Sequence, residues 1–212
     1  LPISMNYHSL REFVDRLENE NELIRIKDHV SPILEITEIT DRVSKQSGGG
    51  KALLFENVEG SNIPVLINAF GSFKRINIAL GIHDIEKIPR DIDKYLKIKP
   101  PSSLLEKVKL LPMLLEAAAF PPKIVSSQKA SCQEVVLVGD DVDLGIIPIL
   151  QCWPDDAGSF ITFPIVVNKT IDQKLRNVGL YRMQVYDKKT TGMHWHIHKD
   201  GAHFFHEYKK QG

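Results

Sequence analysis

Two neighbouring strand patterns in the last forty or so residues constrain the fold most. Residues 174–187 alternate between polar and apolar side chains, and Met193–His198 resumes the pattern after the polar connector Asp187–Thr190. Two such runs joined by a short polar segment predict a β-hairpin. With a period of two, one face takes Asn177, Gly179, Tyr181 and Met183, and the other takes Val178, Leu180, Arg182 and Gln184.

Histidines are concentrated in and after the second of these strands. Five of the eight histidines lie between His194 and His206. His194, His196 and His198 would share one face of a strand, where imidazoles can bind metals or carry protons. One strand histidine is usually a surface or half-buried residue, but three at alternate positions favour a site. His203 and His206 are read as surface residues of a helix, and Trp195 as a packing residue.

Arg182 and an acidic loop before it each allow two interpretations. Arg182 has the fork of donors that binds a carboxylate or phosphate, but a structural ion pair explains it equally well. Asp155 and Asp156 lie between Pro154 and Gly158, where turn formation is favoured over a cation site or a catalytic carboxylate pair.

The order of the elements predicts an α+β fold. Ser9–Glu12 has the pattern of a capping box, followed by apolar residues at helical spacing. Helices expected to about residue 20 and over 73–80 and 84–95 are mixed with strands over 22–26, 51–58 and 63–70. Pro121-Pro122 then marks a boundary, after which strands are expected over 134–138 and 161–168. We therefore predict an N-terminal α+β domain, residues 1–120, and the start of a β-barrel domain, residues 121–212.

Composition narrows the class of partner. The chain of 212 residues carries 27 basic and 27 acidic side chains, so no net charge attracts nucleic acid, and no apolar run approaches the length of a membrane span. Cys132 and Cys152, the two cysteines, lack the spacing of a metal knuckle or a disulfide framework. These features favour a cytoplasmic protein.

Several separate blocks resemble the UbiD family of decarboxylases, which use prenylated flavin mononucleotide (FMN). These blocks follow the order in which the family has them and extend the resemblance to nearly the whole chain. They are Ile147–Gly158, Phe160–Pro164, Arg176–Val185 and Thr191–Trp195. The resemblance implies that the β-barrel domain is a flavin-reductase-like split barrel.

The resemblance also implies a set of site residues. Asn177 would be a ligand of a divalent metal, usually Mn²⁺, and His198 would lie at or beside this metal. K⁺ is a further candidate cofactor. Arg182 would be catalytic, next to the flavin and the substrate carboxylate. The cofactor-binding positions would be Asn177, Leu180, Tyr181, Arg182, His194, Trp195, His196, Lys199 and Asp200.

The implied reaction is the reversible, non-oxidative decarboxylation of an aromatic or α,β-unsaturated carboxylic acid. A flavin prenyltransferase would supply the cofactor, and the full-length protein would form a homo-oligomer. The family's remaining metal ligand and catalytic carboxylates would lie beyond Gly212, so this chain is expected to be an amino-terminal portion that is inactive alone.

Two alternatives remain open from the residues themselves. In a cupin-type barrel, His196, His198 and Glu207 would bind a metal without a flavin. Alternatively, the chain would be a non-catalytic subunit of a multi-component carboxylase.

Overall fold

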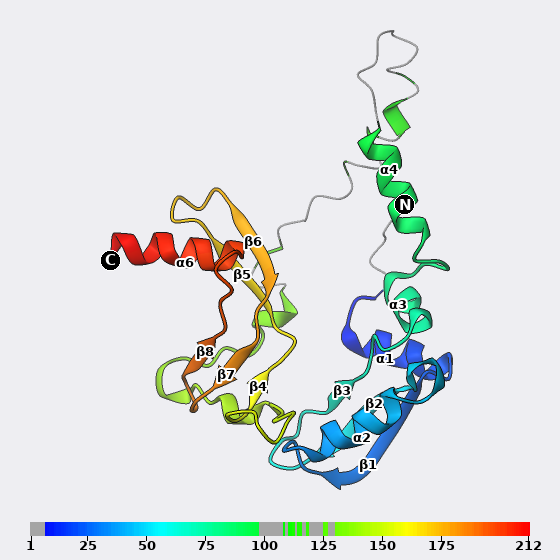
Figure 1. Ribbon diagram of the computed structural model, residues 1–212, viewed down its shortest axis with the longest axis vertical. Coiled ribbons are helices and arrows are strands. Elements are labelled where there is room, and N and C mark those ends of the chain that lie inside the picture. The colour runs from blue at the N-terminus through cyan, green and yellow to red at the C-terminus, as the bar shows by residue number, and fades with distance from the viewer. Residues whose placement is uncertain are drawn as a thin grey trace. The chain divides into compact units, whose positions relative to one another are not determined.

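The computed structural model describes residues 7–97, 108, 110–112, 114, 115, 118, 125, 126 and 130–212 (Figure 1). It contains helices and small sheets together, which confirms the α+β prediction. The helices are α1 (Leu10–Asn19), α2 (Glu35–Ser44), α3 (Phe73–Leu80), α4 (Lys87–Leu96) and α6 (Asp200–Gln211), with short 3₁₀ turns at Ser47–Gly49, Ser131–Gln133, Gly139–Asp141 and Leu144–Ile146. The strands are β1 (Leu23–Val30), β2 (Ala52–Val58), β3 (Val65–Ile67), β4 (Phe160–Ile161), β5 (Ile165–Lys169), β6 (Arg176–Leu180), β7 (Met183–Val185) and β8 (Thr191–Met193).

The chain forms two compact units, each built from several segments. The first contains residues 1–24, 44–53 and 67–136, and the second contains residues 25–43, 54–66 and 137–212. β1, β2 and β3 form a three-stranded sheet in that order. The predicted domain boundary at residues 120 and 121 lies outside the described residues and stays a prediction.

In the first unit, α1 begins as its sequence predicts. The Ser9 hydroxyl oxygen accepts a hydrogen bond from the Glu12 amide at 3.3 Å, and the Glu12 carboxylate accepts one from the His8 amide at 2.8 Å. These bonds satisfy two amides at the start of the helix, which lack partners within it. The apolar stripe of Phe13, Val14 and Leu17 is buried, so the periodicity is confirmed. The capping box is confirmed in part, because Glu12 bonds the amide of His8 rather than that of the N-cap residue Ser9.

A buried arginine organises the glycine loop of this unit. The side chain of Arg75 in α3 is fully buried, and its guanidinium donates to the carbonyls of Gly49 and Gly50 and to the Glu22 carboxylate at 3.0 Å. Burial opposes the ionisation of Glu22, but hydrogen bonds from Lys74 and Arg75 outweigh it and lower the pKa of this carboxyl. The carbonyls of Gly49 and Gly50 therefore bind the Arg75 guanidinium, which gives this loop a structural role.

Replacing Glu22 with glutamine is expected to destabilise the protein by about 1.5–3 kcal/mol, because the buried guanidinium loses a charged acceptor. Because the pKa of Glu22 is lowered in the folded protein, the free energy of unfolding should fall as pH is lowered. The stabilisation that Glu22 gives the folded state is complete above the usual glutamate pKa. It is lost as pH falls through the lowered pKa that Glu22 has in the folded protein. Urea unfolding of Glu22→Gln beside the exposed control Glu18→Gln measures the effect, and equal midpoints would contradict it.

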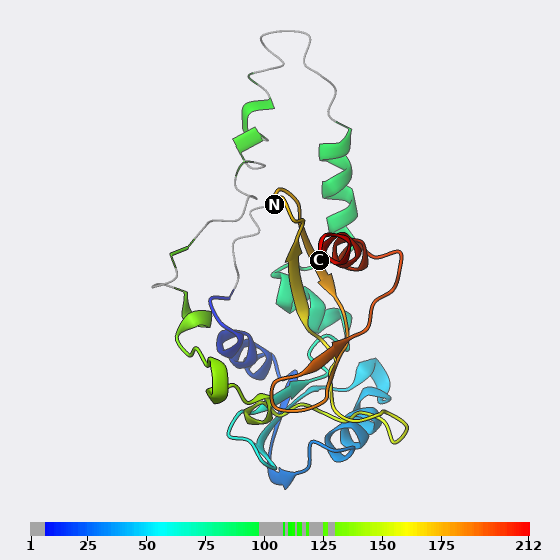
Figure 2. The same cartoon turned by 90° about the vertical axis from the view of Figure 1, so that its left-hand side faces the viewer.

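The second unit contains two small antiparallel sheets. β5 pairs with β6 in a register that sets Asn168 opposite Asn177, and β7 lies between β4 and β8. Helix α6 lies against β5 and β6 (Figures 1 and 2). Within the described residues the two sheets do not close into a barrel.

The hairpin prediction is confirmed in part. β7 and β8 form it, with Met183 opposite Met193. The single strand expected over 174–187 is wrong, because the chain leaves the β5–β6 sheet after Leu180 and enters the β4–β7–β8 sheet at Met183. The strand expected over 161–168 is similarly divided into β4 and β5.

Two further strand predictions are wrong. Residues 134–138 form no strand, and Val135, Val136 and Val138 are exposed there, so their β-branched side chains have no sheet to pack on. The second strand ends at Met193 rather than at His198, because the His196 carbonyl accepts the Lys199 amide in a turn that leads into α6.

Candidate functional site

Arg182 lies in the two-residue link between β6 and β7 and is held by an acidic partner. Its two terminal nitrogens donate to the two carboxylate oxygens of Asp156 at 3.0 and 2.7 Å. The guanidinium carbon lies 3.9 Å from the centre of the Phe160 ring, a distance at which a cation is attracted to the ring face. Of the two interpretations of Arg182, the structure shows the ion pair.

The ion pair keeps both groups charged. The hydrogen bond from Arg182 lowers the pKa of Asp156 despite some desolvation, and the same bond raises the pKa of Arg182. A carboxylate paired in this way stays ionised as pH falls below the usual aspartate range. The pair therefore presents a fixed, permanently charged guanidinium.

The loop carrying Asp156 is fixed to β7 and to its own backbone. The Gln184 side-chain amide donates to the Ala157 carbonyl at 2.8 Å, and the Val185 amide donates to the Ser159 carbonyl at 3.0 Å. The Asp156 amide donates to the Trp153 carbonyl at 3.1 Å. The favoured reading of this loop as a turn is confirmed, although Asp156 also has a specific partner.

Asn177 lies on β6 and is oriented by two neighbours. Its side-chain NH₂ donates to the Asn168 side-chain oxygen at 2.9 Å and to the Tyr181 hydroxyl at 3.2 Å. Since both bonds use the nitrogen, the Asn177 side-chain oxygen is left to act as an acceptor or a metal ligand. An amide oxygen is a suitable ligand for a hard divalent cation.

Tyr181 links β6 to α6. Its side chain is buried, and its hydroxyl accepts the Gly201 amide at 3.0 Å. Its ring packs against Trp195, with centroids 5.0 Å apart, and Trp195 stacks on Phe205 at 5.8 Å. Trp195 is thus a packing residue, as the sequence indicated.

The ring of Tyr181 also explains why position 201 is a glycine. A Cβ atom there would lie 2.6 Å from the Tyr181 hydroxyl oxygen and 2.5 Å from Cζ3 of Trp195. Both distances are too short for a Cβ atom, so only glycine allows α6 to approach the two rings this closely.

His194, His196 and His198 lie beyond the end of β8, so they do not share a strand face as expected. Their rings contact one another in sequence. The rings of His194 and His196 lie 4.8 Å apart, and those of His196 and His198 lie 5.7 Å apart. All three side chains are exposed. Lys199 and Asp200, also exposed, follow at the start of α6.

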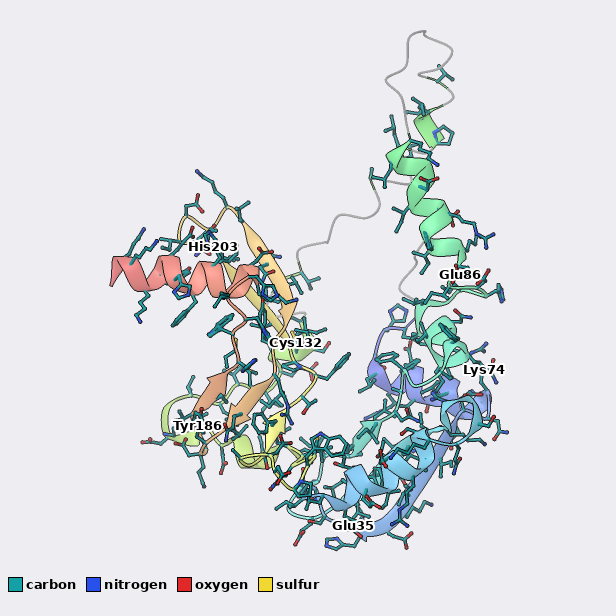
Figure 3. The ribbon with its side chains drawn as sticks, viewed as in Figure 1. Glu35, Lys74, Glu86, Cys132, Tyr186 and His203 are labelled. Carbon is teal, nitrogen blue, oxygen red and sulfur yellow. The ribbon has the colours of Figure 1, made fainter. Side chains whose placement is uncertain are left out.

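The cupin-type alternative is not supported by the position of its glutamate. Glu207 contacts His203 one helical turn earlier, at 3.2 Å. His203 lies on the surface of α6 (Figure 3), and His206 is exposed as well, as predicted. Among the described residues no three His, Cys, Asp or Glu side chains are arranged to hold a metal. A metal at Asn177 would therefore need ligands in addition to those described here.

The residues nevertheless fit part of a flavin phosphate and metal site. Asn177 offers an oriented oxygen and Arg182 offers a fixed cation, and the two positions are five residues apart on one connected segment. Leu180 lies between them on β6 with its side chain exposed.

Asp156 and Asn168 are the side-chain partners of Arg182 and Asn177 that the sequence does not identify. The sequence favours a turn role for Asp156 and gives no role to Asn168. The register of β5 with β6 would have revealed Asn168, but a single sequence gives no signal for which aspartate faces Arg182.

Comparison with known proteins identifies the class and then the family. Residues 14–96 match the 3-octaprenyl-4-hydroxybenzoate carboxy-lyase N-terminal domain, and residues 123–212 match the 3-octaprenyl-4-hydroxybenzoate carboxy-lyase Rift-related domain. Together the two ranges cover well over half of the chain, and they define the class as carboxy-lyases. The chain belongs to the UbiD family of decarboxylases.

Individual relatives and solved structures support this family assignment. An uncharacterised protein of Aquifex aeolicus (strain VF5) is 50% identical over 206 residues, which are 97% of this chain and 42% of that protein. An evolved dimeric form of the UbiD-class enzyme HmfF from Pelotomaculum thermopropionicum, solved with prenylated FMN, has a TM-score of 0.75 at 26% identity, covering 97% of this chain and 42% of the other. Sedimentibacter hydroxybenzoicus vanillic acid decarboxylase in its closed form has a TM-score of 0.76 at 25% identity, covering 97% and 40%. The chain thus spans less than half the length of these relatives.

Membrane-spanning helices are not found in the described part of the chain, where no helix has both the length and the hydropathy that a bilayer requires.

Proposed function

We propose that this chain supplies one wall of the prenylated FMN site of a decarboxylase acting on an aromatic or α,β-unsaturated carboxylic acid. The observation that carries this proposal is the placement of Asn177 and Arg182 on one segment, each oriented by side-chain hydrogen bonds. The structural likeness to a UbiD-class enzyme solved with prenylated FMN supports it. The full-length protein is proposed to be a cytoplasmic homo-oligomer.

Each residue has a role that its chemistry allows. When bound, prenylated FMN supplies the electron sink that loss of carbon dioxide from an sp² carbon requires. Arg182 would bind and orient the substrate carboxylate through its free N–H groups. Asn177 would give one oxygen ligand to a divalent metal, proposed to be Mn²⁺, at the phosphate end of the cofactor.

The surrounding segments would complete the cofactor contacts. Leu180 and Tyr181 continue the strand that carries Asn177, while Trp195 packs on Tyr181 and brings the histidine segment beside it. His194, His196, His198, Lys199 and Asp200 are proposed to contact the cofactor or its metal.

Producing the full-length protein together with a flavin prenyltransferase tests the proposal. We expect the purified protein to retain prenylated FMN, identified by its mass and visible absorbance, and to release carbon dioxide from at least one member of a panel of benzoic, furoic and cinnamic acids. Protein that folds under these conditions but retains no flavin would overturn the proposal.

Asn177→Ala is expected to weaken retention of metal and cofactor by about 100-fold, the upper end of the loss seen when only a supporting group of a metal ligand is removed. Folding should change little, because Asn177 is only half-buried. Metal content and flavin absorbance per protein measure retention, and the unfolding midpoint measures stability. Asn57→Ala, which removes an exposed amide on β2, is the control; equal retention in both variants would exclude Asn177 as a ligand.

A further inference from the structure

The contact between Arg182 and Asp156 uses only part of the guanidinium. Each terminal nitrogen of Arg182 donates one N–H to Asp156. Three of the five N–H groups of an arginine are not used in this pair. The Arg182 side chain keeps 34% of its surface exposed, whereas that of Asp156 keeps 12%. Asp156 therefore holds one edge of the guanidinium, and the Cys152 thiol also lies close enough to interact with it. The part of the group that stays exposed is accessible to a ligand.

The holding carboxylate is itself held in place. The loop around Asp156 is anchored by Gln184 and Val185 of β7, and Phe160, which lies under the guanidinium, pairs directly with Gln184 in the sheet. The residues that fix Asp156 thus belong to the strand that follows Arg182. This arrangement sets the direction of the guanidinium before any ligand arrives.

A purely stabilising role explains this arrangement less well. Ion pairs with a partly exposed arginine contribute little to stability, because water screens the charges and the long side chain loses freedom. A bidentate pair does, however, fix the plane of a guanidinium. Small errors in the placement of a reacting group are costly in rate.

We propose that Asp156 is a positioning residue for Arg182, one that holds the guanidinium by its terminal nitrogens and turns its remaining N–H groups toward the substrate carboxylate. This role rests on the proposed function. It assigns to the acidic loop a part in decarboxylation that is separate from that of the proton donor.

The proposal makes a distinctive kinetic prediction. Asp156→Asn keeps the side-chain size but removes one acceptor of the bidentate pair, so kcat should fall by about 10–100-fold. KM should not rise, because the variant also removes a negative charge close to the site of an anionic substrate. Asp156→Glu restores a carboxylate and should recover part of kcat, whereas Asp155→Asn, in the exposed neighbouring residue, should leave both constants unchanged.

A second measurement does not depend on turnover. In the cofactor-free full-length protein with ¹⁵N-labelled arginine, the pair should slow the rotation of the Arg182 NH₂ groups, and Arg182→Lys assigns their signals. Slow rotation should persist in Asp155→Asn and be lost in Asp156→Asn. Thermal unfolding of each variant separates these effects from misfolding.

The outcomes separate the two proposals. A folded Asp156→Asn variant with the wild-type kcat, or with a raised KM at unchanged kcat, overturns the positioning role, as does rotation that Asp156→Asn leaves slow. If Asp156→Glu is no better than Asp156→Asn although both fold, the role is also overturned. If slow rotation depends on Asp156 while the wild type neither retains flavin nor decarboxylates, the proposed function is what fails, and the role in catalysis fails with it.

Discussion

Arg182→Ala is expected to reduce decarboxylation by the full-length protein by about 10³-fold. Removing a single oriented donor from a site of developing charge typically costs about 10²–10³-fold in kcat, and alanine removes every donor that Arg182 presents. The same loss should appear in the exchange of the substrate carboxylate with labelled carbon dioxide, because the two reactions share the residues that hold the carboxylate. Turnover and exchange should both be measured with protein of known flavin content.

Two comparisons make this result specific. Arg182→Lys keeps the charge but not the planar fork and should also lose most activity, because lysine cannot pair with Asp156 and a substrate carboxylate in the same geometry. Arg176→Ala removes an exposed arginine at the other end of β6 and should have little effect. Full activity in a flavin-loaded Arg182→Ala variant would reject the role given to Arg182.

Tyr181→Ala is expected to have the largest effect on stability, about 3–5 kcal/mol, the range for truncating a large buried aromatic side chain. The ring is buried between Gly201 and Trp195, and its loss would remove the contact that joins β6 to α6. Tyr181→Phe keeps the ring but leaves the Gly201 amide without its acceptor, at a cost of about 1–3 kcal/mol.

Tyr186→Ala is the matched control, since Tyr186 is an exposed tyrosine in the loop between β7 and β8 (Figure 3). Denaturant midpoints for the three variants should fall in the order Tyr186→Ala, Tyr181→Phe, Tyr181→Ala, from most to least stable. If Tyr181→Ala were as stable as Tyr186→Ala, the packing of α6 on β6 through this ring would be wrong.

The local features of the fold were predictable because their causes are local. Ser9 and Glu12 cap α1 through bonds between residues four or fewer apart. The burial of Phe13, Val14 and Leu17 follows from helical periodicity alone. The alternation that predicted β6 holds while that strand has β5 as its partner.

The errors arose where long-range pairing decides the structure. The alternation over 174–187 is continuous in sequence, but β6 pairs with β5 and β7 pairs with β4 and β8, so the strand divides at Tyr181 and Arg182. The histidines alternate as a strand would, yet the turn into α6 interrupts them. Such switches depend on partners elsewhere in the chain, which periodicity does not contain.

The candidate site shows the same difference between local features and features that depend on long-range pairing. The roles expected for Asn177 and Arg182 come from the resemblance to a family and remain predictions. Asp156, 26 residues before Arg182, becomes its partner only because β4 and β7 pair and bring the acidic loop beside the guanidinium. The sequence thus suggested a chemical role for Arg182, but it did not identify Asp156 as its partner.

The most direct test of the account is a structure of the full-length protein with prenylated FMN, metal and a substrate analogue bearing a carboxylate. We expect the Asn177 side-chain oxygen to coordinate the metal at the cofactor phosphate, and Arg182, still paired with Asp156, to donate to the carboxylate of the analogue. A cofactor bound away from β6, with Asn177 and Arg182 both facing solvent, would contradict it.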